Sequence, residues 1–416
     1  MKVKFVTLGC KTNFYESQAM AELFREKGYE IVEKGKADIY VINTCTVTGT
    51  GAQKSRQHIR KAKKENPDAV VAVTGCYSQT EPNEVEKITE VDVMVGTSGR
   101  RRIVEFVEQA LKGRRVLEHE DIMKAREFEE LCLTTSQSRI RANVKIEDGC
   151  NNFCSYCIIP YARGPVRSRS IEKIVEEVEL LSEAGFGEIV LTGIHIGSYG
   201  KDLKNGAGLI DVVEAVCSVN GVKRVRLGSI EPVVINEDFV RRAATLKNLC
   251  PQFHLSLQSG CDATLERMRR RYTTEEYIDA VKRLRKNIGD VSITTDVIVG
   301  FPGETDEEFK QSYEFCKKIG FMQMHVFKYS KRKGTVAEKM ENQVPENIKD
   351  ERSDLMIALA EEMKKAFYDN YKGVEAEVLV EQKMKNGKYH ATTANYMDVY
   401  IDSDEDISGK FIKTIL

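Results

Sequence analysis

Short apolar runs alternate with amphipathic stretches over most of the chain, which predicts strands alternating with helices. In the first 112 residues, runs rich in Val and Ile occur at 3–8, 38–42, 70–74 and 91–95. Such runs are typical of buried parallel strands. Helical periodicity occurs at 16–27, 53–64 and 103–111. Residues 1–112 are therefore predicted to form a small open parallel α/β sheet.

A second series of the same kind fills residues 139–370. Candidate strands lie at 141–146, 188–191, 222–227, 254–257, 293–299 and 325–329. Helical segments lie between them at 171–183, 262–268, 274–287 and 306–319, and a long helix is predicted at 348–368. Six units are too few to close an eight-stranded barrel. We therefore expect an open (βα)6 partial barrel.

The segments on either side of this series have a different character. Residues 113–138 are highly charged with weak periodicity, and we expect a linker. Residues 371–416 alternate between apolar and polar positions around Gly387, which is typical of a small antiparallel β-barrel. The predicted fold class is therefore α/β, with an open sheet, a partial barrel and a small β-barrel in that order.

Composition narrows the class of protein. The chain has 416 residues and no apolar run near 18 residues, so we expect no membrane partner. Its N-terminus is too short and too strand-like for a signal peptide, which favours a cytoplasmic location. The net charge of −1 excludes a globally basic nucleic-acid binder but allows basic patches.

Eleven cysteines in a chain of this length indicate metal binding more than a disulfide framework. Cys150, Cys154 and Cys157 form a C-x3-C-x2-C loop after a predicted strand. Three thiolates at this spacing can hold three irons of a [4Fe–4S] cluster and leave the fourth iron open. A zinc site would need a fourth ligand, and no His or further Cys lies near this loop.

Three more cysteines, Cys10, Cys45 and Cys76, each follow the carboxyl end of a predicted strand. Open α/β sheets place their sites at this edge, and neighbouring strands are only about 5 Å apart. We therefore expect the three loops to converge on a second [4Fe–4S] cluster. The alternative is a set of three inert buried thiols.

These motifs resemble those of the radical S-adenosylmethionine methylthiotransferases over nearly the entire chain. The resemblance is carried by 7–13 (TLGCKTN), 42–48 (INTCTVT), 74–79 (TGCYSQ), the C-x3-C-x2-C loop and 158–169 (IIPYARGPVRSR). Residues 371–416 resemble the RNA-binding TRAM domain. The resemblance implies two [4Fe–4S] clusters and S-adenosylmethionine as cofactors.

The resemblance also implies positions that contact S-adenosylmethionine. Tyr156 would lie against the adenine, and Thr192 with Gly193 would bind the methionine amino group. Ser256 and Gln258 could contact the ribose, and Arg270 could hold the methionine carboxylate. An alternative for Arg270 is a tRNA phosphate patch. The segment 297–304 would help to seat the adenine or simply form a tight turn.

Three substrates compete within the family: N6-isopentenyladenosine in tRNA, N6-threonylcarbamoyladenosine in tRNA, and an aspartate of a ribosomal protein. Residues 9–13, 43–48 and 191–200 (LTGIHIGSYG) resemble the threonylcarbamoyladenosine group. The isopentenyl group usually carries Gln-Asn where this chain has Ile194 and His195. The expected reaction is methylthiolation of carbon 2 of N6-threonylcarbamoyladenosine at position 37 of tRNA.

The resemblance implies that one S-adenosylmethionine methylates sulfur on the second cluster and that another is cleaved to a 5′-deoxyadenosyl radical. The expected partners are the tRNA anticodon loop, an electron donor such as flavodoxin or ferredoxin, and a sulfur donor. An electron carrier with two clusters is a rival of another class, but it needs neither open irons nor an RNA domain. Basic clusters that could meet phosphate are 54–64, Arg163 with Arg167 and Arg169, 269–271 and 331–333.

Overall fold

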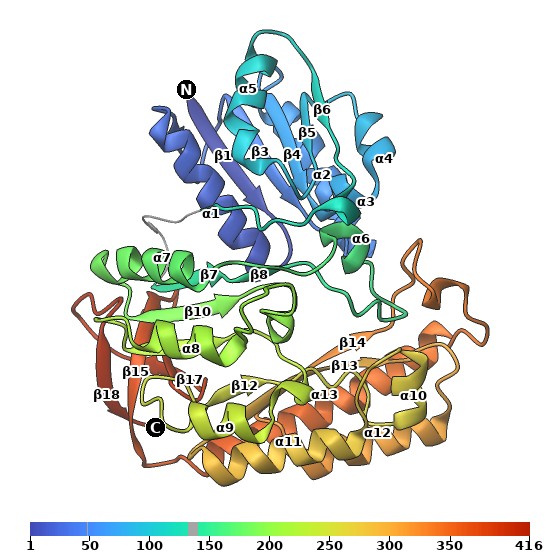
Figure 1. The fold of residues 1–416 in the computed structure, drawn as a ribbon, viewed down its shortest axis with the longest axis vertical. Helices are drawn as coiled ribbons and strands as arrows, with labels where there is room; N and C mark the ends of the chain where they lie inside the picture. Colours follow the sequence, from blue (N-terminus) through green and yellow to red (C-terminus); the bar gives the residue numbers. More distant parts are fainter. Residues whose placement is uncertain (48, 132–139) are drawn as a thin grey trace.

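The structure is a computed structural model that describes residues 1–47, 49–131 and 140–416. Three sheet-containing units follow one another along the chain, with the N-terminal unit at the top in Figure 1. Residue 48, the end of the predicted linker (132–138) and residue 139 lie outside the described residues.

The N-terminal unit is a parallel sheet. Its strand order is β2 (Glu30–Ile31), β1 (Lys2–Thr7), β3 (Ile39–Thr44), β4 (Val70–Gly75), β5 (Val93–Val95) and β6 (Val116–Glu118). β6 belongs to the segment that the sequence predicted as a linker. The N-terminal sheet therefore extends beyond residue 112.

Helices cover both faces of this sheet. The helices are α1 (Lys11–Glu26), α2 (Gly49–Glu65), α3 (Cys76–Thr80), α4 (Pro82–Glu86) and α5 (Ile103–Leu111). Phe24 of α1 and Phe106 of α5 pack into one apolar cluster with Val41, whereas Ile59 of α2 and Tyr77 of α3 lie in the cluster on the other face. The sheet is thus the middle of three layers, as expected for strands buried on both faces.

The central unit contains two three-stranded parallel sheets. One has the order β11 (Arg224–Leu227), β10 (Glu188–Thr192), β7 (Arg141–Lys145), and the other β12 (Gln252–His254), β13 (Ser292–Val299), β14 (Gln323–Lys328). Isolated parallel bridges, Val225 with Leu249 and Ile230 with Leu255, join the sheets. The six strands therefore follow sequence order around one curved wall, which is the predicted open (βα)6 arrangement.

Helices pack on the outside of this wall. They are α7 (Ile171–Glu183), α8 (Leu209–Cys217), α9 (Glu237–Ala243), α10 (Asp262–Arg267), α11 (Thr274–Asn287), α12 (Asp306–Ile319) and α13 (Glu346–Asp369). The strands alternate accordingly: Ala142 and Val144 lie in the apolar core, while Arg141, Asn143 and Lys145 point to the opposite face. The inner face of β7 is therefore polar.

Shorter elements shape the loops of both units. A hairpin of β8 (Glu147–Asp148) and β9 (Arg167–Ser168) flanks α6 (Ile159–Arg163). Single 3₁₀ turns occur at Arg100–Arg102, Ile122–Lys124, Ile196–Ser198, Pro232–Val234 and Ala337–Lys339.

The C-terminal unit is an antiparallel sheet with the order β17 (Asp398–Ile401), β16 (Tyr389–Thr393), β15 (Glu375–Lys383) and β18 (Phe411–Ile415). This sheet packs against the central unit. At the contact, Arg224 of β11 donates hydrogen bonds to the carbonyl oxygens of Thr392 (3.0 Å) and Glu377 (2.7 Å).

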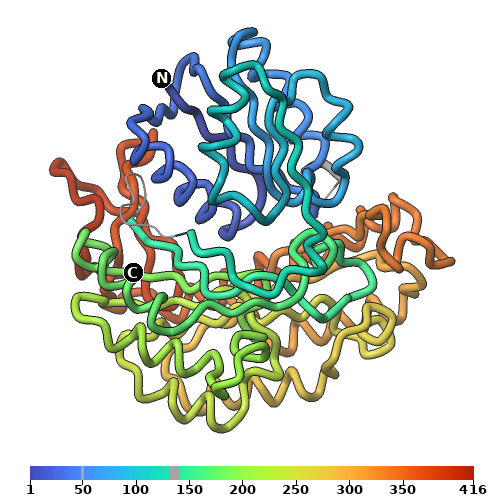
Figure 2. Tube along the Cα trace, turned by 45° about the horizontal axis from the view of Figure 1, so that its top comes forward, coloured from blue at the N-terminus to red at the C-terminus, as the bar shows by residue number. Residues whose placement is uncertain are grey.

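The predicted α/β class is confirmed by these parallel sheets and the antiparallel C-terminal sheet. In Figure 2 the N-terminal unit is seated over the central strands, with the C-terminal sheet at one side. Among the described residues, no helix combines the length and apolarity that crossing a membrane requires.

Candidate functional site

The C-x3-C-x2-C loop follows β8 at the carboxyl end of the barrel strands. Gly149 begins the loop with φ +87°, and a Cβ there would lie 2.0 Å from the Pro165 carbonyl oxygen. The Cys150 N–H donates to the Gly164 carbonyl oxygen at 3.0 Å, and the Cys157 N–H donates to that of Cys154 at 2.9 Å. The loop backbone is therefore held in one conformation.

The three thiols of this loop lie close enough to affect one another. Burial raises the pKa of the Cys150 and Cys157 thiols to about 12, and the charge of Cys154 contributes to both shifts. None of the three is in a disulfide. Cationic metal ions would stabilise the thiolate form of such a buried group.

Arg270 contacts one thiol of this group. Its Nη1 donates to Cys154 Sγ at 3.3 Å, its Nε donates to the Tyr272 hydroxyl at 3.1 Å, and its Nη2 pairs with Glu231 at 2.8 Å. The guanidinium of Arg270 therefore links the cysteine loop to the Tyr272 hydroxyl and the Glu231 carboxylate.

The Glu231 carboxylate contacts several side chains of the site. The sequence analysis did not predict this role. His195 Nε2 lies 3.2 Å from its carboxylate, and Asn152 donates to it at 3.1 Å. Burial alone would raise the pKa of Glu231, but the hydrogen bond from His195 and the charge of Arg270 lower it to about 2. The only signal in the sequence is a carboxylate just past the end of β11.

The other predicted contacts for S-adenosylmethionine line the same edge of the barrel. Tyr156 packs edge-to-face on Phe301 at 6.3 Å, so the segment 297–304 comes next to the cysteine loop. Ser256 and Gln258 follow β12, and Gln258 has φ +68° with its N–H bonded to the Asp296 carbonyl oxygen at 2.9 Å.

Thr192 ends β10, and Gly193 follows it beside a buried carboxylate. Glu147 Oε2 accepts hydrogen bonds from the N–H groups of Ile194 (3.0 Å) and His195 (2.8 Å). Within the described part of the chain, the buried Glu147 Oε1 has no hydrogen-bond partner. A buried carboxyl oxygen without a partner, next to Gly193, can become the carboxylate partner of an ammonium group, which is the group expected at this turn from the family resemblance.

Cys10, Cys45 and Cys76 also lie together. β1, β3 and β4 are neighbours in register, with Thr7, Asn43 and Thr74 in one row at their carboxyl ends. A Cβ added at Gly9 would lie 3.0 Å from Cys45 Sγ.

The three thiols also affect one another's ionisation. Burial raises the pKa of Cys76 to about 11, although the charge of Arg163 opposes the shift and those of Cys10 and Cys45 add to it. The predicted convergence of the three strand ends is present.

Arg163 connects the two groups of cysteines. It ends α6, six residues after Cys157, and its Nε donates to Cys76 Sγ at 3.4 Å. Its Nη2 donates to Asn13 Oδ1 at 2.5 Å. Because the Cys150 N–H also bonds to the Gly164 carbonyl oxygen, the C-terminal end of α6 contacts both Cys76 and the start of the central cysteine loop.

The prediction that Arg163, Arg167 and Arg169 form a phosphate-binding patch is wrong. Their exposed fractions are 0%, 3% and 0%. Arg163 pairs with Glu16, Arg167 with Asp148, and Arg169 with Glu130 and Glu177. Arginines buried in ion pairs cannot meet RNA. By contrast, Arg269 and Arg271 are exposed, as are Lys331 and Lys333.

The donor sets fit clusters better than single ions. Over residues 1–47, 49–131 and 140–416, no three His, Cys, Asp or Glu side chains are arranged around one metal ion. Thiolates of a cluster bind different irons and need not converge on one point. Two groups of three free cysteines, each near a guanidinium, are the pattern that two iron–sulfur clusters would use.

Comparison with known proteins agrees with this site. Residues 144–316 match the family model of the radical SAM superfamily, and residues 2–96 match a model described as "Uncharacterized protein family UPF0004". Among solved structures, the radical S-adenosylmethionine methyltransferase TsrM of Kitasatospora setae superposes with a TM-score of 0.62 at 14% identity. That superposition covers 81% of this chain and 77% of TsrM, and it concerns the fold alone.

Curated relatives cover the full length. The threonylcarbamoyladenosine tRNA methylthiotransferase MtaB of Bacillus subtilis is 45% identical over 99% of this chain and 92% of its own. The enzyme of the same name from Aquifex aeolicus is 39% identical over all of both chains. A tRNA-2-methylthio-N(6)-dimethylallyladenosine synthase of Acetivibrio thermocellus is 34% identical over 98% and 86%. The chain therefore belongs to the radical S-adenosylmethionine tRNA methylthiotransferase family.

Proposed function

We propose that the protein methylthiolates carbon 2 of N6-threonylcarbamoyladenosine at position 37 of tRNA, giving 2-methylthio-N6-threonylcarbamoyladenosine. The observation that carries this proposal is the full-length similarity to enzymes named for that substrate, which exceeds the similarity to the dimethylallyladenosine enzymes. The cofactors of this family are S-adenosylmethionine and [4Fe–4S] clusters. The main alternatives are methylthiolation of N6-isopentenyladenosine in tRNA and of an aspartate of a ribosomal protein.

Two groups of cysteines are proposed to hold the clusters. Cys150, Cys154 and Cys157 would bind the cluster that accepts S-adenosylmethionine, and Cys10, Cys45 and Cys76 the auxiliary cluster. When bound, these groups supply the radical and sulfur chemistry that side chains cannot perform at an aromatic C–H bond. The proximity of both groups to Arg163 and α6 supports a base held between them.

The side chains around the cysteine loop are proposed to bind and orient S-adenosylmethionine. Tyr156, packed on Phe301, would support the adenine. Ser256 and Gln258 would meet the ribose at the end of β12.

The methionine end is proposed to lie near Glu147 and Arg270. Thr192 and Gly193, with the free Glu147 oxygen beside them, would bind its ammonium group. Arg270 would bind its carboxylate, and Glu231 would fix the guanidinium in place.

The proposed partners follow from the reaction. The tRNA anticodon loop supplies the base, an electron donor such as flavodoxin or ferredoxin supplies the electrons, and a separate donor supplies sulfur. Residues 371–416 are proposed to bind RNA as a TRAM-like domain. The protein is proposed to act in the cytoplasm, together with its tRNA substrate.

Nucleoside mass spectrometry of tRNA tests the substrate. A strain without this protein should accumulate N6-threonylcarbamoyladenosine and lack its 2-methylthio form. Purified enzyme should add the methylthio group to such tRNA and leave N6-isopentenyladenosine tRNA unchanged. Modification of the isopentenyl substrate instead would overturn the assignment in favour of the first alternative. Modification of ribosomal protein alone would favour the second.

Iron analysis tests the cluster ligands. Anaerobically reconstituted protein should contain about eight irons per chain, the content of two [4Fe–4S] clusters. Substituting Cys10, Cys45 and Cys76 together by alanine should leave about four irons per chain. Cys261→Ala removes a free thiol that belongs to neither group, and this variant should keep about eight irons per chain. A triple variant that retains all its iron would refute the auxiliary site.

A further inference from the structure

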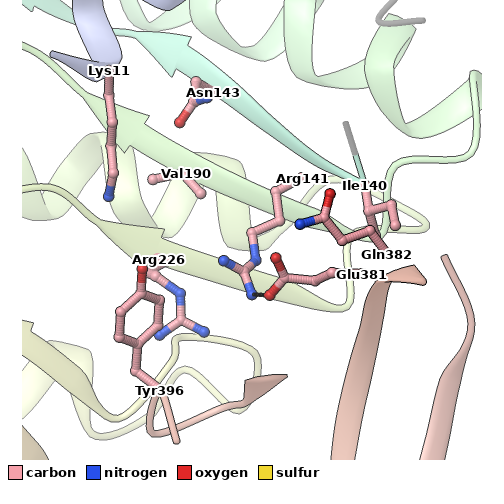
Figure 3. A pocket seen from close by; sticks show the side chains of 9 residues that line it. All are labelled: Lys11, Ile140, Arg141, Asn143, Val190, Arg226, Glu381, Gln382 and Tyr396. Atoms are coloured by element: carbon pink, nitrogen blue, oxygen red, sulfur yellow. Dashed lines mark hydrogen bonds and ion pairs between the residues drawn. The ribbon is translucent and has the colours of Figure 1, made fainter. Parts of the chain in front are cut away.

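A cavity of about 360 Å³ lies where the three units of the chain meet. Its wall includes Lys11 from the N-terminal unit, Arg141 and Arg226 from the barrel, and Glu381 and Tyr396 from the C-terminal sheet (Figure 3). This volume lies in the range of sites for small molecules or parts of them, roughly 300–1,000 Å³. The cavity is therefore large enough for a substituent on a base.

The cavity lies next to the proposed reaction site. Lys11 immediately follows Cys10, and Figure 3 shows its side chain reaching down into the hollow toward Val190 and Arg226. Asn143, Val190 and Arg226 are paired across β7, β10 and β11 and form one row of the wall. Thr192 stands two residues further along β10, a distance of about 7 Å on a strand.

Cations dominate the wall of this cavity. Arg141 and Arg226 share the buried Glu188, at 2.8 and 3.0 Å, and Arg141 also pairs with Glu381. The Tyr396 ring lies against both guanidiniums, with centroid distances of 4.7 Å to Arg226 and 5.7 Å to Arg141. The two arginines are thus fixed in place and largely neutralised.

Lys11 differs from these arginines. Within the described part of the chain, its ammonium group makes no ion pair and no hydrogen bond, and its side chain extends into the hollow. Three cations and one carboxylate, Glu381, therefore line the hollow, and Glu188, which is not part of its wall, pairs with the two arginines. A negatively charged group that entered the hollow would find Lys11 free to pair with it.

We infer that this cavity binds the carboxylate of the threonylcarbamoyl group, with Lys11 as its ionic partner. This inference rests on the proposed function. The threonine part of that substituent carries a negative charge, whereas a dimethylallyl substituent is an uncharged hydrocarbon. Lys11 is thus a specificity-determining residue that favours the charged substrate. A base between the two groups of cysteines would direct its substituent past Lys11 toward Arg226.

Binding of chemically altered RNA to the wild-type holoenzyme tests the inference without any variant. The probe is an anticodon stem–loop RNA with N6-threonylcarbamoyladenosine, compared with the same RNA whose threonyl carboxylate is a carboxamide. A lost charge-assisted contact should raise Kd by about 10- to 100-fold at constant salt. Equal affinity for the two RNAs would overturn the inference.

The variant Lys11→Met then tests whether Lys11 is the residue that binds the carboxylate. Its preference for the carboxylate RNA should fall to less than about threefold, whereas Lys11→Arg should keep most of the preference. Lys27→Met makes the same change at the other end of α1, where the side chain is exposed, and should behave as wild type. If Lys11→Met weakened both RNAs equally, the bound anion would be an RNA phosphate and the inference would fail.

Two further readouts separate the possible failures. Iron content should be the same in Lys11→Met and Lys27→Met. If Lys11→Met lost iron, the role of Lys11 would be tested instead by comparing the carboxylate and carboxamide RNAs in wild type and in Lys11→Arg. Methylthio product is measured separately. Wild-type enzyme that binds the carboxylate RNA preferentially but modifies only another substrate would refute the proposed function, whereas product formation without charge preference would refute the inference alone.

Discussion

Arg163 Nε lies 3.4 Å from Cys76 Sγ, so a guanidinium of the central barrel contacts a thiol of the N-terminal unit. The same side chain pairs with Glu16 at 2.5 Å, and Arg100 and Lys145 reach the same carboxylate at 2.6 and 2.8 Å. Burial disfavours a charged carboxylate, but these three cations hold the pKa of Glu16 well below its usual range. The N-terminal unit and the barrel are thus joined by a buried, charged network.

Replacing Arg163 should weaken this junction. Arg163→Met leaves the Glu16 carboxylate buried with one cation fewer, and breaking a buried ion pair typically costs about 3–5 kcal/mol. The free energy of unfolding, measured in urea under anaerobic conditions, should fall by that order. Arg60→Met, on the exposed face of α2, should change it by less than about 0.5 kcal/mol. Equal stability of the two variants would show that the network contributes little.

A methyl group at Gly149 should disrupt the central cysteine loop. The residue has φ +87°, and the new Cβ would lie 2.0 Å from the Pro165 carbonyl oxygen. Gly149→Ala should therefore lower iron to about four per chain, the content of one cluster. Gly185 has φ +96° but open space around its Cβ position.

Gly185→Ala separates backbone strain from the clash. It should cost only about 1–2 kcal/mol of strain and keep full iron content. Iron and labile sulfide analysis of both proteins makes the comparison. Full iron in Gly149→Ala would mean that the loop can move without losing its cluster.

Glu147 should make stability depend on pH. Burial and the neighbouring Asp148 raise its pKa from 4.5 to about 8. Between these values the folded protein retains a proton that the unfolded chain has released, so stability falls as the pH rises. The loss attributable to one such group is up to about 1.4 kcal/mol per pH unit.

Glu147→Gln should remove this part of the dependence. Urea unfolding of both proteins without S-adenosylmethionine, at about pH 6 and about pH 7.5, measures it. Wild type should lose more stability than the variant between the two values. Parallel losses would mean that Glu147 is already ionised in the folded protein.

Arg271 should contribute to RNA binding through phosphate. It is exposed and lies at the rim of the cysteine loop, 3.4 Å from the Asn151 carbonyl oxygen. Arg271→Gln should weaken tRNA binding and reduce the slope of log K against log salt by about 0.7–0.9, as for one lost phosphate contact. Arg241→Gln, on the outer helix α9, should leave the slope unchanged. An unchanged slope in Arg271→Gln would exclude it from the RNA interface.

Much of the fold could be predicted because its signals are local. The helices α11 and α12 begin and end at the predicted residues, and each starts with a capping box from Thr273 or Thr305 to a glutamate three residues on. The strands β2 and β6 were missed, since both are short and neither lies in an apolar run like that around β5. The antiparallel C-terminal sheet was expected from its alternation.

The site was predictable where spacing or topology dictates it. The convergence of Cys10, Cys45 and Cys76 followed from their places at parallel strand ends. Arg163 was wrongly predicted to bind phosphate. The sequence alone does not distinguish an exposed arginine from one that is buried against a distant carboxylate such as Glu16. Glu147 and Glu231 were missed because a single glutamate after a strand has no distinguishing spacing.

The Glu16 network also limits how these enzymes can be recombined. The carboxylate stands on α1, while Arg163 and Lys145 come from the barrel and Arg100 from the turn before α5. A chimera that took the N-terminal sheet from one methylthiotransferase and the barrel from another would inherit half of a charge-balanced junction. Keeping this junction intact in such a chimera therefore requires the exchange of α1, this turn, β7 and α6 as a single block.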